Sequence, residues 1–263
     1  MLVRPEILAA RPTLVALTRL GATRSTVLRL TVTSGPAGLD VDAAGGRVLD
    51  AGLRSELAAA AEAGELARLS WGGEPIALRR QPVQAMGRAQ VVPPPGAFLQ
   101  ATAEGEAALV AAVREATAGA RRVADLFAGC GTFALPLAET AEVRAVEGDD
   151  AMLTALAAGW RNAAGLRRVT TEVRDLFQRP LLAPELAGLD AVVIDPPRAG
   201  AEAQSRVLAG SGVPRIAAVS CDPASFARDA RLLVEGGFRL DWVQPVDQFR
   251  WSGHVELAAQ FSR

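Results

Sequence analysis

The amino-acid sequence predicts an α/β protein, with a doubly wound and mostly parallel sheet that follows a smaller N-terminal α+β domain. Two observations support this prediction. From residue 101 onward, short apolar runs alternate with helical patterns, as strands and helices do around a parallel sheet. Acidic and thiol side chains repeatedly stand at the ends of these apolar runs, where a parallel sheet collects its ligands.

The first 90 residues read differently from the rest. They hold short β-like runs at 27–33 and 39–41, broken by glycines, and one alanine-rich helical stretch at 55–63. Three consecutive prolines within residues 91–96 cannot continue a helix or a central strand, because proline has no N–H donor. We therefore expect a small α+β domain at 1–92 and a larger domain at 93–263.

In the larger domain, each expected strand leads to a polar or reactive residue. Strands are expected at 123–127, 143–146, 169–173, 189–194, 216–219, 238–243 and 255–260. Helices are expected at 104–116, around Leu135, at 151–162, between 197 and 216, and at 226–235. The residues at the first five strand ends are Asp125, Glu147, Asp175, Asp195 and Cys221.

The composition limits which binding partners and which cellular compartment we expect for the protein. Half of the residues are hydrophobic and 22% are charged, so a sizeable core is expected. Because the net charge is −1, an RNA-binding surface needs a local basic patch or a contribution from outside this chain. Every basic residue is arginine, which suits phosphate recognition but also fits a plain compositional bias. The two cysteines match no metal or disulfide spacing, and no signal peptide or membrane span is seen, so we expect a cytoplasmic protein without metal.

The segment 125–133 is a candidate cofactor loop. It reads DLFAGCGTF, with two glycines that let the backbone approach a ligand. Ala134 leaves a dinucleotide-binding pattern open, and an ordinary strand–turn–helix glycine pair is the other alternative. Asp125 can face a ligand ammonium group, and Glu147 can accept hydrogen bonds from a ribose diol. Such an acid-rich site without a phosphate cradle suits S-adenosylmethionine better than NAD.

The turn at residues 195–198 reads DPPR and ends a buried strand. Amino-group methyltransferases follow a similar turn with an aromatic residue, and Arg198 argues against that chemistry here. Methylation at carbon 5 of uracil needs a thiolate that adds to carbon 6 and a base that removes the carbon-5 proton. Cys221 is the candidate nucleophile. His254 and Glu256 are the candidate bases, and strand alternation puts both on one face.

Several motifs occur together in a fixed order. They are PGAFLQ (95–100), DLFAGCGTFALPLA (125–138), VEG (146–148), DPPRAG (195–200), SCDPASFARD (220–229) and HVE (254–256). With these motifs the chain resembles the RNA uridine-5-methyltransferases, which act on bacterial 23S rRNA and tRNA. The resemblance implies a class I, Rossmann-like methyltransferase fold, with Cys221 as nucleophile and Glu256 as base. It also implies that six residues contact S-adenosylmethionine or shape its pocket: Gln100, Phe127, Thr132, Glu147, Asp175 and Asp195.

The chain departs from this family in a few places. Asp222 stands where the family usually has asparagine, and an extra carboxylate there is expected to raise the thiol pKa. Thr102 replaces a frequent asparagine, and neither the N-terminal TRAM domain nor the four-cysteine iron–sulfur motif has a counterpart.

The expected function is methylation of uridine carbon 5 in RNA, 23S rRNA before tRNA, by a monomer without a membrane partner. The alternatives are a methyltransferase for DNA or a small molecule, a non-catalytic RNA-binding or ribosome-assembly protein, and a Rossmann oxidoreductase.

Overall fold

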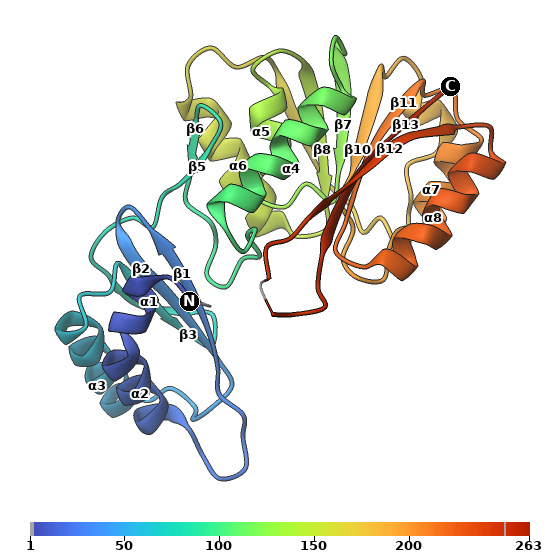
Figure 1. Ribbon diagram of the computed structural model, residues 1–263. Coiled ribbons are helices and arrows are strands. Elements are labelled where there is room, and N and C mark those ends of the chain that lie inside the picture. Colours follow the sequence, from blue (N-terminus) through green and yellow to red (C-terminus); the bar gives the residue numbers. More distant parts are fainter. Residues whose placement is uncertain (1–2, 250) are drawn as a thin grey trace. The chain divides into compact units, whose positions relative to one another are not determined.

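A computed structural model describes residues 3–249 and 251–263 of the chain, which forms two compact units (Figure 1). The smaller unit runs to Gln84 and also includes Val92–Ala97. The larger unit comprises Ala85–Val91 and Phe98–Arg263. The sequence predicts a single boundary after residue 92, whereas the chain passes between the units near residues 84, 91 and 97.

The smaller unit is a four-stranded sheet with helices packed on it. Its elements are α1 (Pro5–Ala9), α2 (Arg11–Gly21), β1 (Arg29–Gly35), β2 (Gly38–Ala44), α3 (Ala51–Ala63), β3 (Arg68–Trp71) and β4 (Glu74–Leu78). The strand order is β1-β2-β3-β4, in which β2 and β3 are parallel and the outer pairs are antiparallel. Leu17 of α2 and Leu57 of α3 are fully buried with Val41 of β2 in its core.

Helices α1 and α2 are not predicted from the sequence, whose patterns indicate one helix in this unit. Pro5 and Pro12 lie in the first turns of these helices, where the missing proline N–H breaks no helical hydrogen bond. Helices this short gain their stability from tertiary packing rather than from propensity. That packing is not visible in a local sequence pattern.

The proline-rich stretch is part of the smaller unit rather than a free linker. Arg68 and Asp40 form a buried ion pair, in which the Arg68 Nε donates to Asp40 Oδ1 at 2.7 Å. The Arg68 Nη2 also donates to the Pro93 carbonyl oxygen at 2.9 Å. Buried charges need such complete pairing because an unpaired one is strongly unfavourable. The pair therefore holds residues 92–97 against β3.

The larger unit is built on a seven-stranded sheet of order β12-β13-β11-β10-β7-β8-β9. The strands of this unit are β5 (Gln84–Met86), β6 (Ala89–Val91), β7 (Arg122–Leu126), β8 (Glu142–Glu147), β9 (Val169–Val173), β10 (Ala191–Ile194), β11 (Arg215–Ser220), β12 (Arg239–Val246) and β13 (Glu256–Ser262). The helices are α4 (Ala103–Ala116), α5 (Ala134–Leu137), α6 (Asp150–Asn162), η1 (Ala183–Leu186), α7 (Glu202–Ala209) and α8 (Pro223–Glu235).

Strands β7 to β11 pair in parallel, and β13 pairs antiparallel with both β11 and β12. Figure 1 shows α4, α5 and α6 on one side of this sheet and α7 and α8 on the other. The predicted doubly wound α/β fold is thus confirmed. None of the helices in the described residues is both long and apolar enough to cross a membrane.

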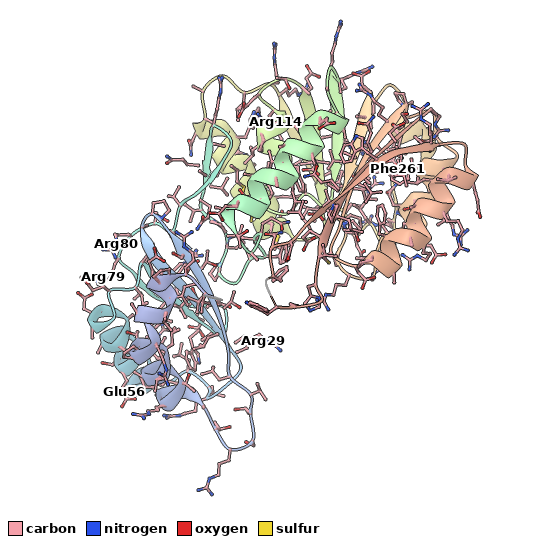
Figure 2. The ribbon with its side chains drawn as sticks, viewed as in Figure 1. Arg29, Glu56, Arg79, Arg80, Arg114 and Phe261 are labelled. Carbon is pink, nitrogen blue, oxygen red and sulfur yellow. The ribbon has the colours of Figure 1, made fainter. Side chains whose placement is uncertain are left out.

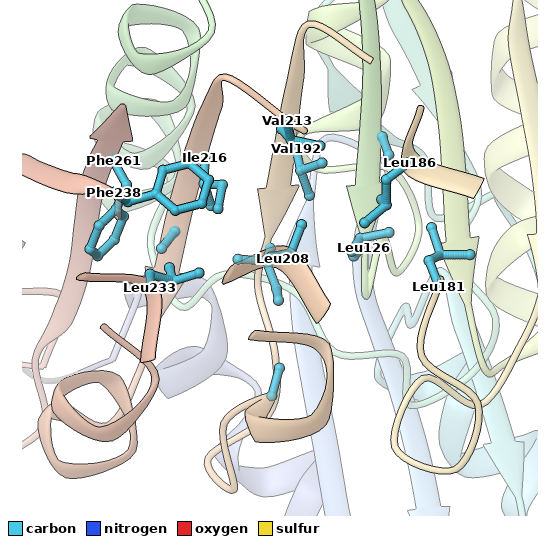
Figure 3. Close-up of a cluster of buried hydrophobic side chains, with 14 of the residues drawn as sticks. Leu126, Leu181, Leu186, Val192, Leu208, Val213, Ile216, Leu233, Phe238 and Phe261 are labelled. Atoms are coloured by element: carbon cyan, nitrogen blue, oxygen red, sulfur yellow. The ribbon is translucent and has the colours of Figure 1, made fainter. Parts of the chain in front are cut away.

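One hydrophobic core fills the space between the sheet and the helices α7 and α8 (Figure 3). Ile216 and Val192 of the sheet and Leu208 of α7 are each fully buried there. Phe261, from the last strand, is also fully buried inside the larger unit (Figure 2). This core fixes the strands whose ends carry the candidate site.

The hairpin β5–β6 packs on α6 in the larger unit. Gly159 of α6 allows this approach, because a Cβ added there would lie 2.7 Å from Val91 Cγ2 and 3.2 Å from the Gln90 carbonyl oxygen. In an open helix, replacing glycine by alanine stabilises by about 1 kcal/mol. Overpacking works against that gain and costs about 1 to 3 kcal/mol.

We therefore expect Gly159→Ala to lower the free energy of unfolding by about 1 kcal/mol, because the overpacking exceeds the gain in helix propensity. Val91→Ala, which removes the methyl group that the new Cβ meets, should cost less stability in the Gly159→Ala chain than in the wild type. Urea unfolding of the two single variants and the double variant measures the coupling. Stabilisation by Gly159→Ala alone would contradict the packing of the hairpin on α6.

Candidate active site

The candidate site lies at the carboxyl ends of the parallel strands. Because β7 to β11 run in parallel, the residues that follow them meet along one edge of the sheet. Glu147 ends β8, Asp195 follows β10 and Cys221 follows β11. Asp175 comes two residues after β9, and Asp125 is the penultimate residue of β7. The structure thus places the residues of the predicted strand ends on one edge.

The glycine-rich loop after β7 has an unusual backbone. Phe127 has a φ of 62°, a left-handed conformation that a bulky residue seldom adopts. Its ring packs against Phe177 with the ring centroids 5.3 Å apart. Gly131 has a φ of 99°, and a Cβ added there would lie 2.9 Å from the side chains of Leu135 and Leu156. The loop therefore needs glycine at this position, and the half-buried Thr132 follows it.

Two acidic groups of this edge are held in surroundings that oppose their charge. Asp125 is fully buried, and neither of its carboxylate oxygens has a hydrogen-bond partner among the described residues. Burial and then the charge of Asp195 hold the pKa of Asp125 well above its usual range, although the nearby Ala134 N–H opposes them, and the charge of Glu147 adds to the rise. Burial and then the charge of Glu256 raise the pKa of Asp195 to about 7. A fully buried carboxyl group without a hydrogen-bond partner, such as that of Asp125, is typical of functional sites.

Glu147 ties the glycine loop to the start of α6. Its Oε2 accepts from the Gly129 N–H at 3.0 Å. Its Oε1 accepts from the N–H groups of Gly148 and Asp149, at 2.6 and 3.1 Å. A carboxylate offers about four acceptor positions, so about one is left for a ligand hydroxyl unless a backbone bond is released. Glu147 can accept hydrogen bonds from both hydroxyls of a ribose diol, as the sequence suggests, only if one of these backbone hydrogen bonds is broken.

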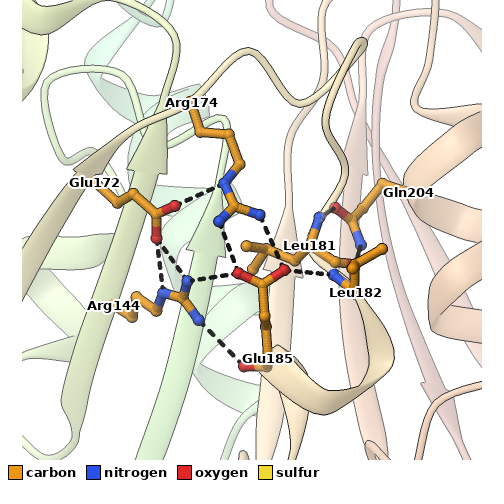
Figure 4. Close-up of polar contacts among 7 residues, drawn as sticks. All are labelled: Arg144, Glu172, Arg174, Leu181, Leu182, Glu185 and Gln204. Atoms are coloured by element: carbon orange, nitrogen blue, oxygen red, sulfur yellow. Dashed lines mark hydrogen bonds and ion pairs between the residues drawn. The ribbon is translucent and has the colours of Figure 1, made fainter.

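Asp175 shapes the loop after β9. Its Oδ1 accepts from the N–H groups of Phe177 and Gln178, and its Oδ2 accepts from Gln178 Nε2 at 2.8 Å. The strand before it is anchored by a network of two arginines and two glutamates from β8, the β9 segment and η1 (Figure 4). The members of that network are Arg144, Glu172, Arg174 and Glu185. The anchored strand sets the position of the Asp175 turn and of Phe177 beside Phe127.

Cys221 and Glu256 lie together at the β11–β13 end of the edge. Ser220 pairs with Leu257 in the antiparallel register, so the next residues along, Cys221 and Glu256, are neighbours across the two strands. Burial raises the pKa of the Cys221 thiol, and the charges of Glu256 and Asp195 raise it further, while Arg198 opposes them. Glu256 is only 5% exposed, and burial raises its pKa too. The arrangement joins a thiol with a carboxyl group of raised basicity.

His254 and Glu256, the two candidate bases, occupy different positions in the structure, although strand alternation predicts that they share one face. Strand β13 begins at Glu256, so His254 lies in the preceding loop, where it is exposed. Its ring nitrogens lie 2.8 and 3.0 Å from the Arg198 Nη2. The assumption of a common strand face is therefore wrong. Glu256 is buried beside the thiol, and His254 holds Arg198 at the rim.

The expected effect of Asp222 on the thiol is not seen. The Asp222 carboxylate caps α8, where its Oδ1 accepts from the N–H groups of Ala224 and Ser225 at 3.0 and 2.8 Å. These hydrogen bonds, the Ser225 bond first, lower the pKa of Asp222. The groups that raise the pKa of Cys221 are other carboxylates, those of Glu256 and Asp195. Asparagine and aspartate cap helices about equally well, which accounts for the exchange.

Gln248 contacts the candidate site, and its role is not predicted from the sequence. It is 8% exposed, and its Nε2 donates to the Gln100 Oε1 at 2.8 Å. Its Oε1 accepts from the Thr102 N–H at 3.2 Å, and Gly105 leaves room for its side chain. Gln248 therefore orients Gln100 from a loop 148 residues away in sequence. A lone glutamine carries no sequence signal for such a role.

The second cysteine has different surroundings from Cys221. Cys130 is 1% exposed, and burial raises its pKa to about 12 with help from Asp149 and Glu147. A thiolate is needed for nucleophilic attack, so Cys130 is a poor nucleophile near neutral pH. Cys221 is half-buried, so its thiol is the more accessible of the two.

Comparison with known proteins gives relatives along most of the chain, although no protein-family model matches it. An uncharacterized RNA methyltransferase of Mesorhizobium japonicum is 49% identical over 255 residues, which are 97% of this chain and 62% of that protein. The 23S rRNA (uracil(1939)-C(5))-methyltransferase of Chromohalobacter salexigens is 46% identical over 172 residues, 64% of this chain and 35% of that enzyme. The resemblance predicted from the motifs is thus confirmed. The chain spans less than two thirds of the length of these relatives.

A solved structure shares the fold. The crystal structure of Pyrococcus abyssi tRNA (uracil-54, C5)-methyltransferase in complex with S-adenosyl-L-homocysteine is similar, with a TM-score of 0.75 and 19% sequence identity. The similarity covers 97% of this chain and 65% of that one. The fold is therefore that of the methyltransferases, as the sequence predicts.

The electrostatics of the thiol lead to a pH-dependent prediction. Removing the Glu256 charge lowers the pKa of Cys221, because that charge opposes ionisation of the thiol. Glu256→Gln should therefore shift the alkaline rise of Cys221 alkylation to lower pH, as followed by mass spectrometry of the labelled peptide. Asp222→Asn is the matched control and should leave the midpoint in place, since Asp222 caps α8. A shift with Asp222→Asn and none with Glu256→Gln would contradict the assignment.

Proposed function

We propose that this chain, a relative of the bacterial RNA methyltransferases, transfers a methyl group from S-adenosylmethionine to carbon 5 of a uridine in RNA. The observation that carries the proposal is the pairing of β11 with β13, which sets Cys221 beside Glu256. Methylation at carbon 5 of uracil needs both a thiol and a base, and few other methyl transfers need this pair. The enzyme is proposed to act as a monomer in the cytoplasm.

The residues support the reaction in a definite order. The Cys221 thiolate adds to carbon 6 of the uracil ring, which makes carbon 5 a nucleophile that can accept the methyl group. Glu256 then takes the proton from carbon 5, and the bond between Cys221 and carbon 6 breaks to release the methylated base. S-adenosylmethionine, when bound, supplies the methyl group on a sulfonium centre. Burial raises the pKa of Glu256, which makes its carboxylate a stronger base for this step.

The loop between β7 and α6 fits S-adenosylmethionine. The left-handed Phe127, Gly129 and Gly131 let the backbone pass close to a ligand, and Asp125 lacks a hydrogen-bond partner among the described residues. A ligand with an ammonium group and ribose hydroxyls suits these acids, whereas a pyrophosphate does not. We assign Gln100, Phe127, Thr132, Glu147, Asp175 and Asp195 to the cofactor pocket.

Among RNA substrates, we propose 23S rRNA. The 23S rRNA enzyme of Chromohalobacter salexigens is 46% identical over the matched residues. The tRNA enzyme of Pyrococcus abyssi is 19% identical, which supports a common fold without bearing on the substrate. Methylation assays with 23S rRNA fragments and with tRNA transcripts distinguish the two.

The cofactor assignment predicts that Glu147→Ala weakens S-adenosylmethionine binding at least tenfold, which corresponds to about 1.4 kcal/mol. Both a ribose hydrogen bond and the anchoring of the Gly129 N–H are lost. Isothermal titration calorimetry measures the dissociation constant. Glu142→Ala, at the exposed far end of the same strand, is the control and should bind normally. An unchanged dissociation constant for Glu147→Ala would show that Glu147 does not contact S-adenosylmethionine.

The proposed base predicts a trapped intermediate. Glu256→Gln should leave addition and methyl transfer intact and stop proton removal, because glutamine keeps the size of the side chain but cannot accept the proton. A methylated RNA adduct that resists denaturing electrophoresis should then accumulate with ordinary uridine. His254→Ala should slow turnover without trapping RNA, since His254 contacts Arg198 rather than the thiol. Trapping by His254→Ala together with free turnover by Glu256→Gln would reverse the two roles.

A further inference from the structure

Trp251 is the most exposed large apolar side chain among the described residues, at 94% exposure. It lies in the loop between β12 and β13, five residues before Glu256. Its backbone φ is 67°, a left-handed conformation that a non-glycine residue rarely adopts and that is unfavourable without a compensating role. The indole is thus presented to solvent from a strained backbone close to the candidate site.

The loop that carries Trp251 is held by hydrogen bonds on both sides. Before Trp251, the Asp247 carboxylate accepts from the Phe249 N–H at 2.9 Å. After it, the Ser252 N–H donates to the Phe249 carbonyl oxygen at 3.0 Å, and the Ser252 hydroxyl accepts from the His254 N–H at 3.2 Å. Among the described residues, Trp251 therefore lies between segments that are each held by hydrogen bonds.

Both ends of this turn contact the candidate site. Gln248, at its start, is bonded to Gln100. His254, at its end, contacts Arg198 and meets the Phe249 ring edge-on, with the ring centroids 6.1 Å apart. Arg198 is exposed, and its charge acts on both Cys221 and Glu256. Trp251 thus lies in the same turn as His254, which contacts Arg198, a cation that complements a phosphate group.

We propose that Trp251 stacks on an unpaired nucleobase of the RNA strand next to the target uridine. This inference rests on the proposed function for the identity of the strand. A target base must leave its stack to reach Cys221, which exposes the faces of its neighbours. Aromatic side chains receive such faces without regard to sequence. An exposed indole in the turn that borders the candidate site holds the strand while the uridine enters the site.

The test compares two single-stranded probes of equal length, an oligouridylate and a strand of abasic ribose phosphates. The abasic strand keeps the charges and removes the stacking faces. The wild-type chain should bind the oligouridylate more tightly, and Trp251→Ala should lose that preference, with its affinity for oligouridylate falling roughly tenfold. Trp251→Phe should keep most of the preference, because a phenyl ring also stacks. Val48→Ala, which changes a 90%-exposed side chain of the smaller unit, should bind as the wild type does.

Each other result overturns the inference. Equal affinity of Trp251→Ala and the wild type for oligouridylate would show that the indole contacts no base. An equal loss for both probes would show that Trp251 acts through the backbone or the loop. These binding measurements need no methyl transfer. Failure of the chain to methylate RNA would refute the proposed function, but the binding of the two probes could still be compared.

Discussion

The candidate site depends on one pairing, the antiparallel contact of β13 with β11. The parallel strands β7 to β11 bring the acidic residues and Cys221 to a common edge, with Asp195 close enough for its charge to act on the thiol. Strand β13 inserts between β11 and β12 in the opposite direction, so its first residue, Glu256, arrives at the carboxyl end of β11. A thiol and a base from distant parts of the sequence are neighbours for this reason.

The carboxyl ends of the parallel strands, together with the first residue of β13, gather acidic groups at one edge. Asp125, Asp195 and Glu256 all have raised pKa values, with burial as the first cause in each case. Arg198 is the cation that acts on both Glu256 and Cys221, and it is kept at the rim by His254. An acidic edge opposes ionisation of the thiol but raises the basicity of the carboxylates. The same residues therefore favour proton removal at the expense of thiolate formation.

Much of this organisation could be predicted from the sequence, because it follows local patterns. The alternation of apolar runs gives the doubly wound sheet, and β9 lies at the predicted residues 169–173. What the sequence does not reveal depends on contacts between distant segments. The distinction between Glu256 and His254 requires the start of β13, and the part played by Gln248 requires its contact with Gln100. Asp222 follows Cys221 in the sequence, yet its carboxylate caps α8.

The central claim is that Cys221 forms a covalent bond to the substrate base. Incubation with S-adenosylmethionine and RNA that contains 5-fluorouridine tests it directly, because fluorine at carbon 5 cannot be removed as a proton can. We expect an adduct that survives denaturing electrophoresis, maps to Cys221 by peptide mass spectrometry and is absent from Cys221→Ala. Methylation of ordinary uridine with no adduct on the fluorinated RNA, or an adduct at Cys130, would contradict it.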